Sequence, residues 1–209
     1  MDSLNYQKTY WQNFIKTSEA DVLAKDLNSY WNAQNGSYTD ATEIPKEMLD
    51  VLVKNNCLNK VLDFGVGFGR NQKYLSSLFK EVHGFDLPEM ISKVQEKKLT
   101  ENKLFSNFNE LDEDYSLVYE ATAFQHMPPQ EVLFYLMMLS LRAKFLFLWT
   151  RSYNDFGRNF ILKMGGLNMA HLVGATSCCW ELIFSSEPKM YSLNDESHFF
   201  ILYKSKTTQ

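Results

Sequence analysis

The sequence predicts an α/β fold built on a seven-stranded, mostly parallel sheet with helices on both faces and a terminal antiparallel hairpin. Three observations support this fold class. Short apolar runs alternate with helix-like stretches along the middle of the chain, which is typical of a parallel sheet covered on both faces. One of these runs opens into a turn that contains three glycines. Two strand-like runs near the end of the chain are joined by a polar loop, as in a hairpin. We therefore assign residues 57–209 to the α/β domain and residues 1–56 to an N-terminal helical extension.

Helices are indicated by periodic apolar residues and by proline near a first turn. In residues 42–55, Ile44, Met48 and Leu52 recur near the helical period, so one amphipathic helix leads into the first strand. Pro88 suits the first turn of another helix, because proline lacks only an N–H that has no partner there. The helices that follow strands are expected at 70–79, 88–97 and 129–141.

The strands are short apolar runs bounded by polar or turn-forming residues. Residues 143–150 form a continuous apolar stretch, as expected of a central parallel strand that is buried on both faces. Residues 178–185 and 197–204 are the two runs that form the hairpin. Within the stretch 143–150 the strand is expected at 144–150, and the remaining strands are expected at 60–64, 81–86, 103–107 and 115–121.

The glycine-rich turn indicates a ligand site at the carboxyl edge of the sheet. Gly65, Gly67 and Gly69 follow Asp63 at alternate positions, and glycine allows a backbone to pass close to a ligand. The dinucleotide fingerprint G-x-G-x-x-G does not fit, because the third glycine comes one residue early and Arg70 stands in its place. A phosphate-binding P-loop is excluded, because no Lys-Ser or Lys-Thr pair follows the glycines.

This segment resembles motif I of the class I S-adenosylmethionine-dependent methyltransferases, whose pattern is an apolar strand followed by D-x-G-x-G-x-G. Asp63, Gly65, Gly67 and Gly69 match that pattern position by position, and the resemblance extends over about residues 60–205. It implies S-adenosylmethionine as the cofactor, with Asp63 near its methionyl amino group and the glycines beneath it. A carboxylate is a suitable partner for an ammonium group.

Two further segments complete the predicted cofactor site. Asp86 ends the second strand roughly twenty residues after the turn, where an acid can accept from both ribose hydroxyls. Leu87 and Met90 follow and are near enough to touch the base or sugar. By the resemblance, Asn107 takes the place of an acid that meets the adenine amino group, and the backbone amide of Phe108 meets the same base.

Residues 115–128 resemble the fourth strand of the family and the loop behind it, which runs past the sulfonium toward the methyl acceptor. Glu120, Thr122, Phe124 and His126 are therefore expected at the face where the methyl group is transferred. Among them, Glu120 is also expected to contact the cofactor, and Phe124 to contact the substrate.

Fewer residues of the sequence indicate how the methyl acceptor is bound and deprotonated. His126, Glu120 and Tyr153 are the candidate catalytic bases, in no order, since imidazole and carboxylate groups can accept a proton from an acceptor atom. Arg151, expected just after the fifth strand, can bind an acidic acceptor through two N–H groups of its guanidinium group. Each has an alternative explanation: a histidine here can simply begin a helix, and an arginine on a loop is often solvated.

Composition narrows the partners. The net charge of −4 provides no basic stripe for nucleic acid, and no D-P-P-Y or N-P-P-Y motif for methylating DNA bases is present. The three cysteines have neither metal-ligand spacing nor a disulfide pattern, so no metal is expected. The apolar stretch 132–149 is interrupted by Ser140, Arg142 and Lys144, which disfavours a membrane span. We expect a cytoplasmic protein, monomeric or homodimeric, with a small-molecule acceptor.

Three functions are compatible with the sequence. The first is a methyltransferase for a small molecule, with the aromatic residues of the first fifty positions forming a lid over the cofactor or simply packing on the sheet. The second is a methyltransferase-like module that binds S-adenosylmethionine or a partner without catalysis. The third is a protein or RNA methyltransferase.

Overall fold

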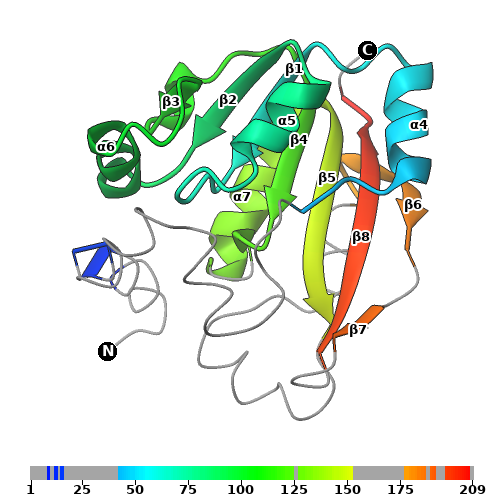
Figure 1. Ribbon diagram of the computed structural model, residues 1–209. Helices are drawn as coiled ribbons and strands as arrows, with labels where there is room; N and C mark the ends of the chain where they lie inside the picture. Colours follow the sequence, from blue (N-terminus) through cyan, green and yellow to red (C-terminus); the bar gives the residue numbers. More distant parts are fainter. Residues whose placement is uncertain are drawn as a thin grey trace.

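The structure is a computed structural model that describes residues 42–124, 127–152, 177–186, 189–191 and 196–207, together with residues 9, 12, 13, 15 and 16. Its elements alternate along the chain as the sequence predicts (Figure 1). The elements are α4 (Lys46–Lys54), β1 (Lys60–Phe64), α5 (Gln72–Leu78), β2 (Glu81–Phe85), α6 (Pro88–Glu96), β3 (Lys103–Phe105), the 3-10 helix η1 (Phe108–Glu110), β4 (Tyr115–Ala121), α7 (Pro129–Ser140), β5 (Ala143–Ser152), β6 (Trp180–Ser185), β7 (Lys189–Tyr191) and β8 (Glu196–Ser205).

The strands form one mixed sheet in the order β3-β2-β1-β4-β5-β8-β6. The strands from β3 to β5 are parallel, and β8 runs antiparallel to both β5 and β6. The predicted fold class is confirmed, including the terminal antiparallel pair. The structure adds the three-residue strand β7, which pairs with β8 beside β6 and makes the sheet eight-stranded rather than seven-stranded.

Helices cover both faces of the sheet (Figure 1). On one face, Met48 and Leu52 of α4 and Leu75 of α5 pack with sheet residues such as Leu117. On the other face, α7 packs its buried side chains, including Leu136, against the opposite side of the same strands. Two apolar cores therefore sandwich the sheet and hold the carboxyl ends of β1, β2 and β4 at fixed positions.

Element bounds differ from the prediction where proline or a partner strand decides them. Helix α4 begins at Lys46 rather than at residue 42, because Pro45 keeps the preceding chain extended. Strand β5 runs to Ser152, two residues beyond the prediction, because β8 pairs with it to its end. Arg151 consequently lies within β5, opposite His198 of β8 in the strand register, and not in the loop after β5.

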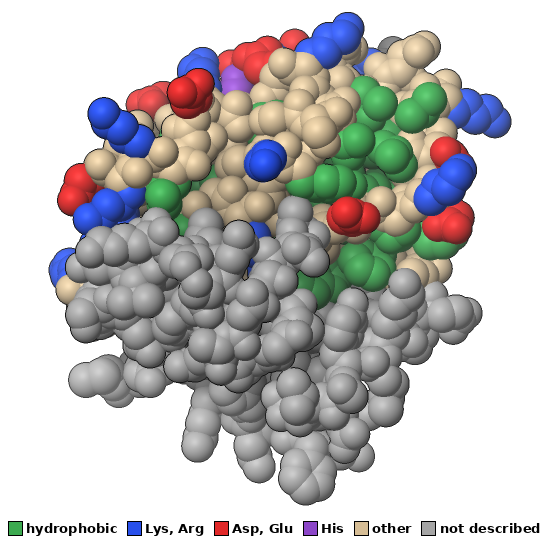
Figure 2. Space-filling model, in the orientation of Figure 1, with side chains coloured by type: hydrophobic (Ala, Val, Ile, Leu, Met, Phe, Trp, Pro, Cys, Tyr) green, Lys and Arg blue, Asp and Glu red, His purple; other side chains and the backbone are tan. Residues whose placement is uncertain are grey.

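Charged and apolar side chains are distributed unevenly over the surface. In Figure 2, acidic and basic side chains gather along the upper rim, where the amino ends of the parallel strands lie in Figure 1. The carboxyl ends, where the glycine turn lies, are at the opposite edge. Within the described part of the chain, no helix is long and apolar enough to cross a membrane.

Candidate functional site

The turn after β1 holds three glycines in the left-handed backbone region. Their φ angles are +79° at Gly65, +52° at Gly67 and +82° at Gly69. The N–H groups of Gly65 and Val66 donate to the carbonyl oxygen of Phe85, at 2.8 and 3.1 Å, so the turn is fastened to the end of β2. A Cβ atom at position 65 would lie 2.3 Å from the Cβ atom of Ala123, in the loop after β4. The backbone is thus fixed between two neighbouring strand ends.

Open space lies beside Gly67. A Cβ atom at this position would meet no atom within 4 Å, unlike one at Gly65. The N–H of Gly67 donates to Oδ2 of Asp86 over 2.8 Å. The turn therefore presents a bare stretch of backbone next to an acid, which is the arrangement expected of a cradle for a ligand.

Asp63 is buried at the end of β1 with one oxygen satisfied and one not. Its side chain is 1% exposed. Oδ2 accepts a hydrogen bond of 2.6 Å from Nε2 of Gln72, whereas Oδ1 has no hydrogen-bond partner among the described residues. Burial raises the pKa of Asp63 to about 7, against the opposing effects of Gln72 and Arg70. A buried acceptor without a partner is costly unless a ligand completes it.

Asp86 follows β2 and is held by two backbone N–H groups. Its Oδ2 accepts from Gly67, and its Oδ1 accepts from Leu87 over 2.7 Å. Burial raises its pKa to about 6, although both hydrogen bonds oppose the change. Each carboxylate oxygen can accept a second hydrogen bond, so the fixed carboxylate can still receive two hydroxyl groups.

The start of α6 lies against the glycine turn. Met90 is 5% exposed and packs with Phe68, Val94 and Ile15, while Leu87 is partly buried against the same cluster. Met90 therefore supports the turn from within a small core, and its predicted contact with a base or sugar stays a prediction. Ile15 brings part of the N-terminal extension against the turn.

Asn107 and Phe108 lie where β3 ends. The Oδ1 atom of Asn107 accepts from the backbone N–H of Asn109 over 3.1 Å and so caps η1. Phe108 is partly buried and lies edge-on to Phe85, with 5.8 Å between ring centroids. The guanidinium group of Arg142 lies over the ring of Phe108, 5.2 Å from its centroid. These contacts are structural, and the predicted adenine contacts remain predictions.

Glu120 is the next-to-last residue of β4, and its side chain is 1% exposed. Its Oε1 accepts from the backbone N–H of Phe124 over 2.7 Å, which shapes the loop after β4. Burial raises the pKa of Glu120 to about 8. Phe124 is itself buried against Phe64, at 5.1 Å between centroids, and Thr122 has a φ of +72° that β-branched residues rarely adopt.

For the other predicted site residues, the structure tests only the position of Arg151 along the chain. His126 and Tyr153 lie outside the described residues. Arg151 is described only as part of β5, so the expectation that it follows that strand is wrong. The structure thus brings together Asp63, the glycine turn and Asp86, with Glu120 on the next strand.

Two contributors were not predicted from the sequence. Gln72, 2% exposed, contacts Asp63 directly, and Arg70 lies over Trp149 at 5.8 Å while lowering the pKa of Asp63. The only sequence signal for either was its position within three residues of Gly69. No pattern of apolar residues distinguishes a buried glutamine from an exposed one at a helix start.

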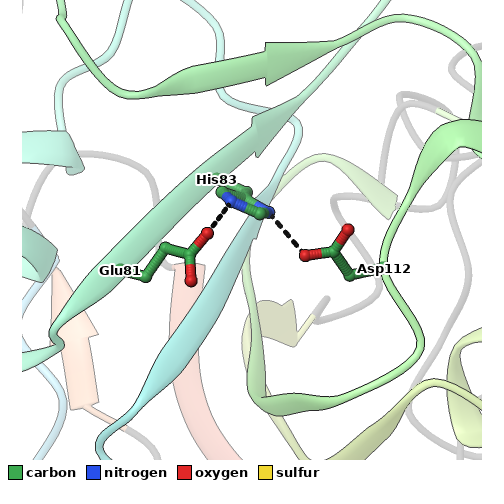
Figure 3. A group of neighbouring side chains, drawn as sticks. All are labelled: Glu81, His83 and Asp112. Atoms are coloured by element: carbon green, nitrogen blue, oxygen red, sulfur yellow. Dashed lines mark hydrogen bonds and ion pairs between the residues drawn. The ribbon is translucent and has the colours of Figure 1, made fainter.

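A second polar cluster lies at the opposite edge of the sheet (Figure 3). His83 on β2 lies between two carboxylates, with Nε2 2.7 Å from Glu81 and Nδ1 3.8 Å from Asp112. Nδ1 is also 2.9 Å from the hydroxyl of Tyr115. Because the carboxylates face different ring nitrogens, and the ammonium of Lys60 is 2.7 Å from Asp112, this geometry suits a link between strands better than convergence on one cation.

Comparison with known proteins identifies the fold. No family model and no curated protein sequence matches the chain significantly. Among solved structures, magnesium protoporphyrin IX methyltransferase from Synechocystis with bound S-adenosylmethionine is 15% identical, with a TM-score of 0.60 over 95% of this chain and 96% of that one.

Two further structures agree. The N-methyltransferase NodS from Bradyrhizobium japonicum, in complex with S-adenosylhomocysteine, is 11% identical, with a TM-score of 0.62 over 91% of this chain and 100% of that one. An S-adenosylmethionine-dependent methyltransferase from Clostridium acetobutylicum is 10% identical, with a TM-score of 0.59 over 86% of this chain and 98% of that one. At these identities the likeness concerns the fold, and the chain has the class I methyltransferase fold.

Proposed function

We propose that this protein is an S-adenosylmethionine-dependent methyltransferase that acts on a small-molecule acceptor. The observation that carries the proposal is the buried, unpartnered Oδ1 of Asp63 beside the open backbone of Gly67. An acceptor atom in this position needs a donor from a ligand, and an ammonium group supplies one. The solved structures with this fold that contain S-adenosylmethionine or S-adenosylhomocysteine support the choice of ligand.

The described residues fit that cofactor. Asp63 would accept from its α-ammonium group, and Asp86, already fixed by Gly67 and Leu87, would accept from its ribose hydroxyls. When bound, S-adenosylmethionine supplies an electrophilic methyl group on a sulfonium that is a good leaving group. The chain's own contribution is then chiefly alignment of the acceptor, which brings two reactants together at a high effective concentration.

Two observations favour a small acceptor. The net charge of −4 does not suit binding to nucleic acid. Ile15 also packs against Phe68 of the glycine turn, and Gln12 donates to Glu89 over 2.8 Å, so part of the N-terminal extension lies beside the site. We propose that the segment around Gln12 and Ile15 borders the acceptor side of the site and favours a small molecule over a macromolecule.

Calorimetric titration with S-adenosylhomocysteine tests the cofactor site. We expect micromolar affinity, on the order of −7 to −8 kcal/mol, for the wild-type protein. Asp63→Ala and Asp86→Ala should each weaken binding by about tenfold or more, because each removes a charged acceptor. The control is Asp50→Ala, since Asp50 lies on the outer surface of α4. Undiminished binding by both site variants would refute the site.

Transfer of a labelled methyl group tests catalysis. The protein is incubated with methyl-labelled S-adenosylmethionine and a cell extract, which is then separated into small-molecule, protein and RNA fractions. Label in the small-molecule fraction, absent with Asp63→Ala, is the expected result. Label confined to protein or RNA would refute the small acceptor. Cofactor binding without transfer to any fraction would favour a binding module instead.

A further inference from the structure

Gln72 is a buried polar residue in the first turn of α5, directly after the glycine turn. Its side chain is 2% exposed, and its backbone N–H donates to the carbonyl oxygen of Gly69 over 3.1 Å. The side-chain Nε2 donates to Oδ2 of Asp63 over 2.6 Å. A buried amide is retained against its desolvation penalty only where its hydrogen bonds are satisfied.

A second amide fixes the orientation of Gln72. Nδ2 of Asn102, in the loop before β3, donates to Oε1 of Gln72 over 2.9 Å and to Oγ of Ser76 over 3.1 Å. If the amide of Gln72 were rotated by half a turn, its oxygen would face the carboxylate oxygen of Asp63 and its NH₂ group would face the NH₂ group of Asn102. Because an ionised Asp63 can only accept, the NH₂ group of Gln72 must face it, and Oε1 of Gln72 is then the acceptor for Asn102.

The consequence for Asp63 is directional. Gln72 occupies Oδ2, and Oδ1 is left as the atom without a partner. A carboxylate held at one oxygen cannot rotate to satisfy the other, so its free oxygen has a defined direction. Two other groups change the pKa of Asp63: Arg70 lowers it and Asp86 raises it. Asp63 in turn raises the pKa values of Tyr119 and Glu120.

We propose that Gln72 is a positioning residue. Held by Asn102, its amide fixes the carboxylate of Asp63 so that Oδ1 receives the α-ammonium group of the cofactor. This inference rests on the proposed function, and it extends it by assigning recognition of the amino-acid part of the cofactor to a chain of three side chains, Asn102, Gln72 and Asp63.

Comparing the affinities for two ligands distinguishes a positioning role of Gln72 from a general role in supporting the site. S-adenosylhomocysteine carries the α-ammonium group, whereas 5′-methylthioadenosine retains the adenosine and sulfur but lacks the amino-acid part. Gln72→Leu should weaken binding of S-adenosylhomocysteine by about ten- to a hundredfold at pH 7, because a hydrogen bond to a charged group is lost. It should leave the affinity for 5′-methylthioadenosine unchanged. Gln95→Leu, at an exposed position on α6, is the matched control.

The pH profile supplies a second readout. Affinity of the wild-type protein for S-adenosylhomocysteine should rise with pH through the titration of Asp63 near 7. In Gln72→Leu the midpoint should move to higher pH, because the hydrogen bond that favours the ionised carboxylate is gone. A role limited to packing would leave the midpoint in place.

Asn102→Ala tests the inference through a less buried residue. It should weaken S-adenosylhomocysteine binding in the same direction as Gln72→Leu but less, since Gln72 remains. In an Asp63→Asn background, Gln72→Leu should have no further effect on this affinity, because the group that it positions has lost its charge.

The outcomes are distinct. Equal loss of both ligands in Gln72→Leu, or no loss of either, would overturn the positioning role while the proposed function stands. Wild-type protein that binds neither ligand would overturn the proposed function and this inference with it. Selective loss of S-adenosylhomocysteine together with a raised pH midpoint is the result that we expect.

Discussion

Gly65 and Gly67 both have left-handed backbones, but they differ in the space that is available for a side chain. At Gly65 there is no room for a side chain, because a Cβ atom would lie 2.3 Å from that of Ala123. At Gly67 the space is open, and only the φ of +52° disfavours a side chain. The first glycine therefore serves the fold, and the second leaves the cradle free for a ligand.

Alanine substitutions should separate these two roles. Gly65→Ala should lower the free energy of unfolding by about 2–4 kcal/mol, through both backbone strain and overpacking. Gly67→Ala should lower it by only about 1–2 kcal/mol, but its methyl group should enter the cradle and weaken S-adenosylhomocysteine binding by about tenfold or more. Urea unfolding and calorimetric titration measure the two effects. A Gly67→Ala variant that binds with wild-type affinity would contradict the assignment of the cradle.

At the residue scale, the sequence predicts that Asp63 and Asp86 lie beside the glycine turn, as they do in the structure, but it does not predict their hydrogen-bond partners. Asp63 and Asp86 were placed by their spacing from the glycines, because the strand-turn-helix connection has a nearly fixed length. That Gln72 takes one oxygen of Asp63 depends on α5 packing against β1, which no local pattern encodes. The left-handed Thr122 was equally hidden, since threonine does not indicate such a conformation.

At the element scale, the bounds of the central strands were predictable because these strands are buried on both faces. β1 and β4 were each predicted to the residue, as their apolar runs end at polar turns. The sequence does not predict β7, because this strand has only three residues and forms by pairing with the first residues of β8. Short edge strands depend on their partner more than on their own sequence.

Lys60 links the amino ends of three strands. From the first position of β1, its ammonium is 2.7 Å from both Asp112 and Asp114, which precede β4, and 3.9 Å from Glu81 on β2. The side chain of Lys60 is 15% exposed. Its pKa is raised, because the interactions with Asp112 and Asp114 outweigh the opposing effect of burial.

Removing this link should destabilise the fold in a pH-dependent way. Lys60→Met should lower the free energy of unfolding by about 1 kcal/mol at pH 7. The hydrogen bond from Lys60 holds the pKa of Asp112 below its ordinary value of 3.8. The stabilisation is therefore present above that ordinary value and is lost as pH falls through the lower, folded value.

The matched control for this link is an exposed ion pair. Lys46 on α4 is 2.6 Å from Asp50, but their side chains are 80% and 61% exposed. Lys46→Met should change stability less than Lys60→Met does, because both charged groups of this pair are exposed to solvent. Urea unfolding of both variants at pH 7 and at pH 3 measures the difference. Equal effects of the two substitutions at pH 7 would show that Lys60 contributes no more than a surface pair.

At the scale of the whole molecule, the two edges of the sheet have opposite electrostatic character. At the amino edge, Asp112 is paired with the ammonium of Lys60, and Glu81 lies within hydrogen-bond distance of His83. The carboxyl edge buries Asp63 and Glu120, and this burial raises the pKa of each carboxyl group. Binding sites commonly keep groups that destabilise the ligand-free protein.

This arrangement predicts how ligand binding and stability depend on pH. The folded pKa values of Asp86, Asp63 and Glu120 are about 6, 7 and 8, against ordinary values of 3.8, 3.8 and 4.5. Their contribution to stability is fully present below the ordinary values and is lost as pH rises through the folded values. The melting temperature of the ligand-free protein should therefore fall between about pH 5 and pH 8.

S-adenosylhomocysteine should raise the melting temperature more at pH 8 than at pH 5.5, because its ammonium group pairs with ionised Asp63. In Asp63→Asn the ligand-free melting curve should depend less on pH and the ligand should add little stability at either pH. Thermal unfolding with and without ligand measures both effects. A wild-type slope that Asp63→Asn leaves unchanged would show that the buried carboxyl group of Asp63 is not the group that couples the cofactor site to folding.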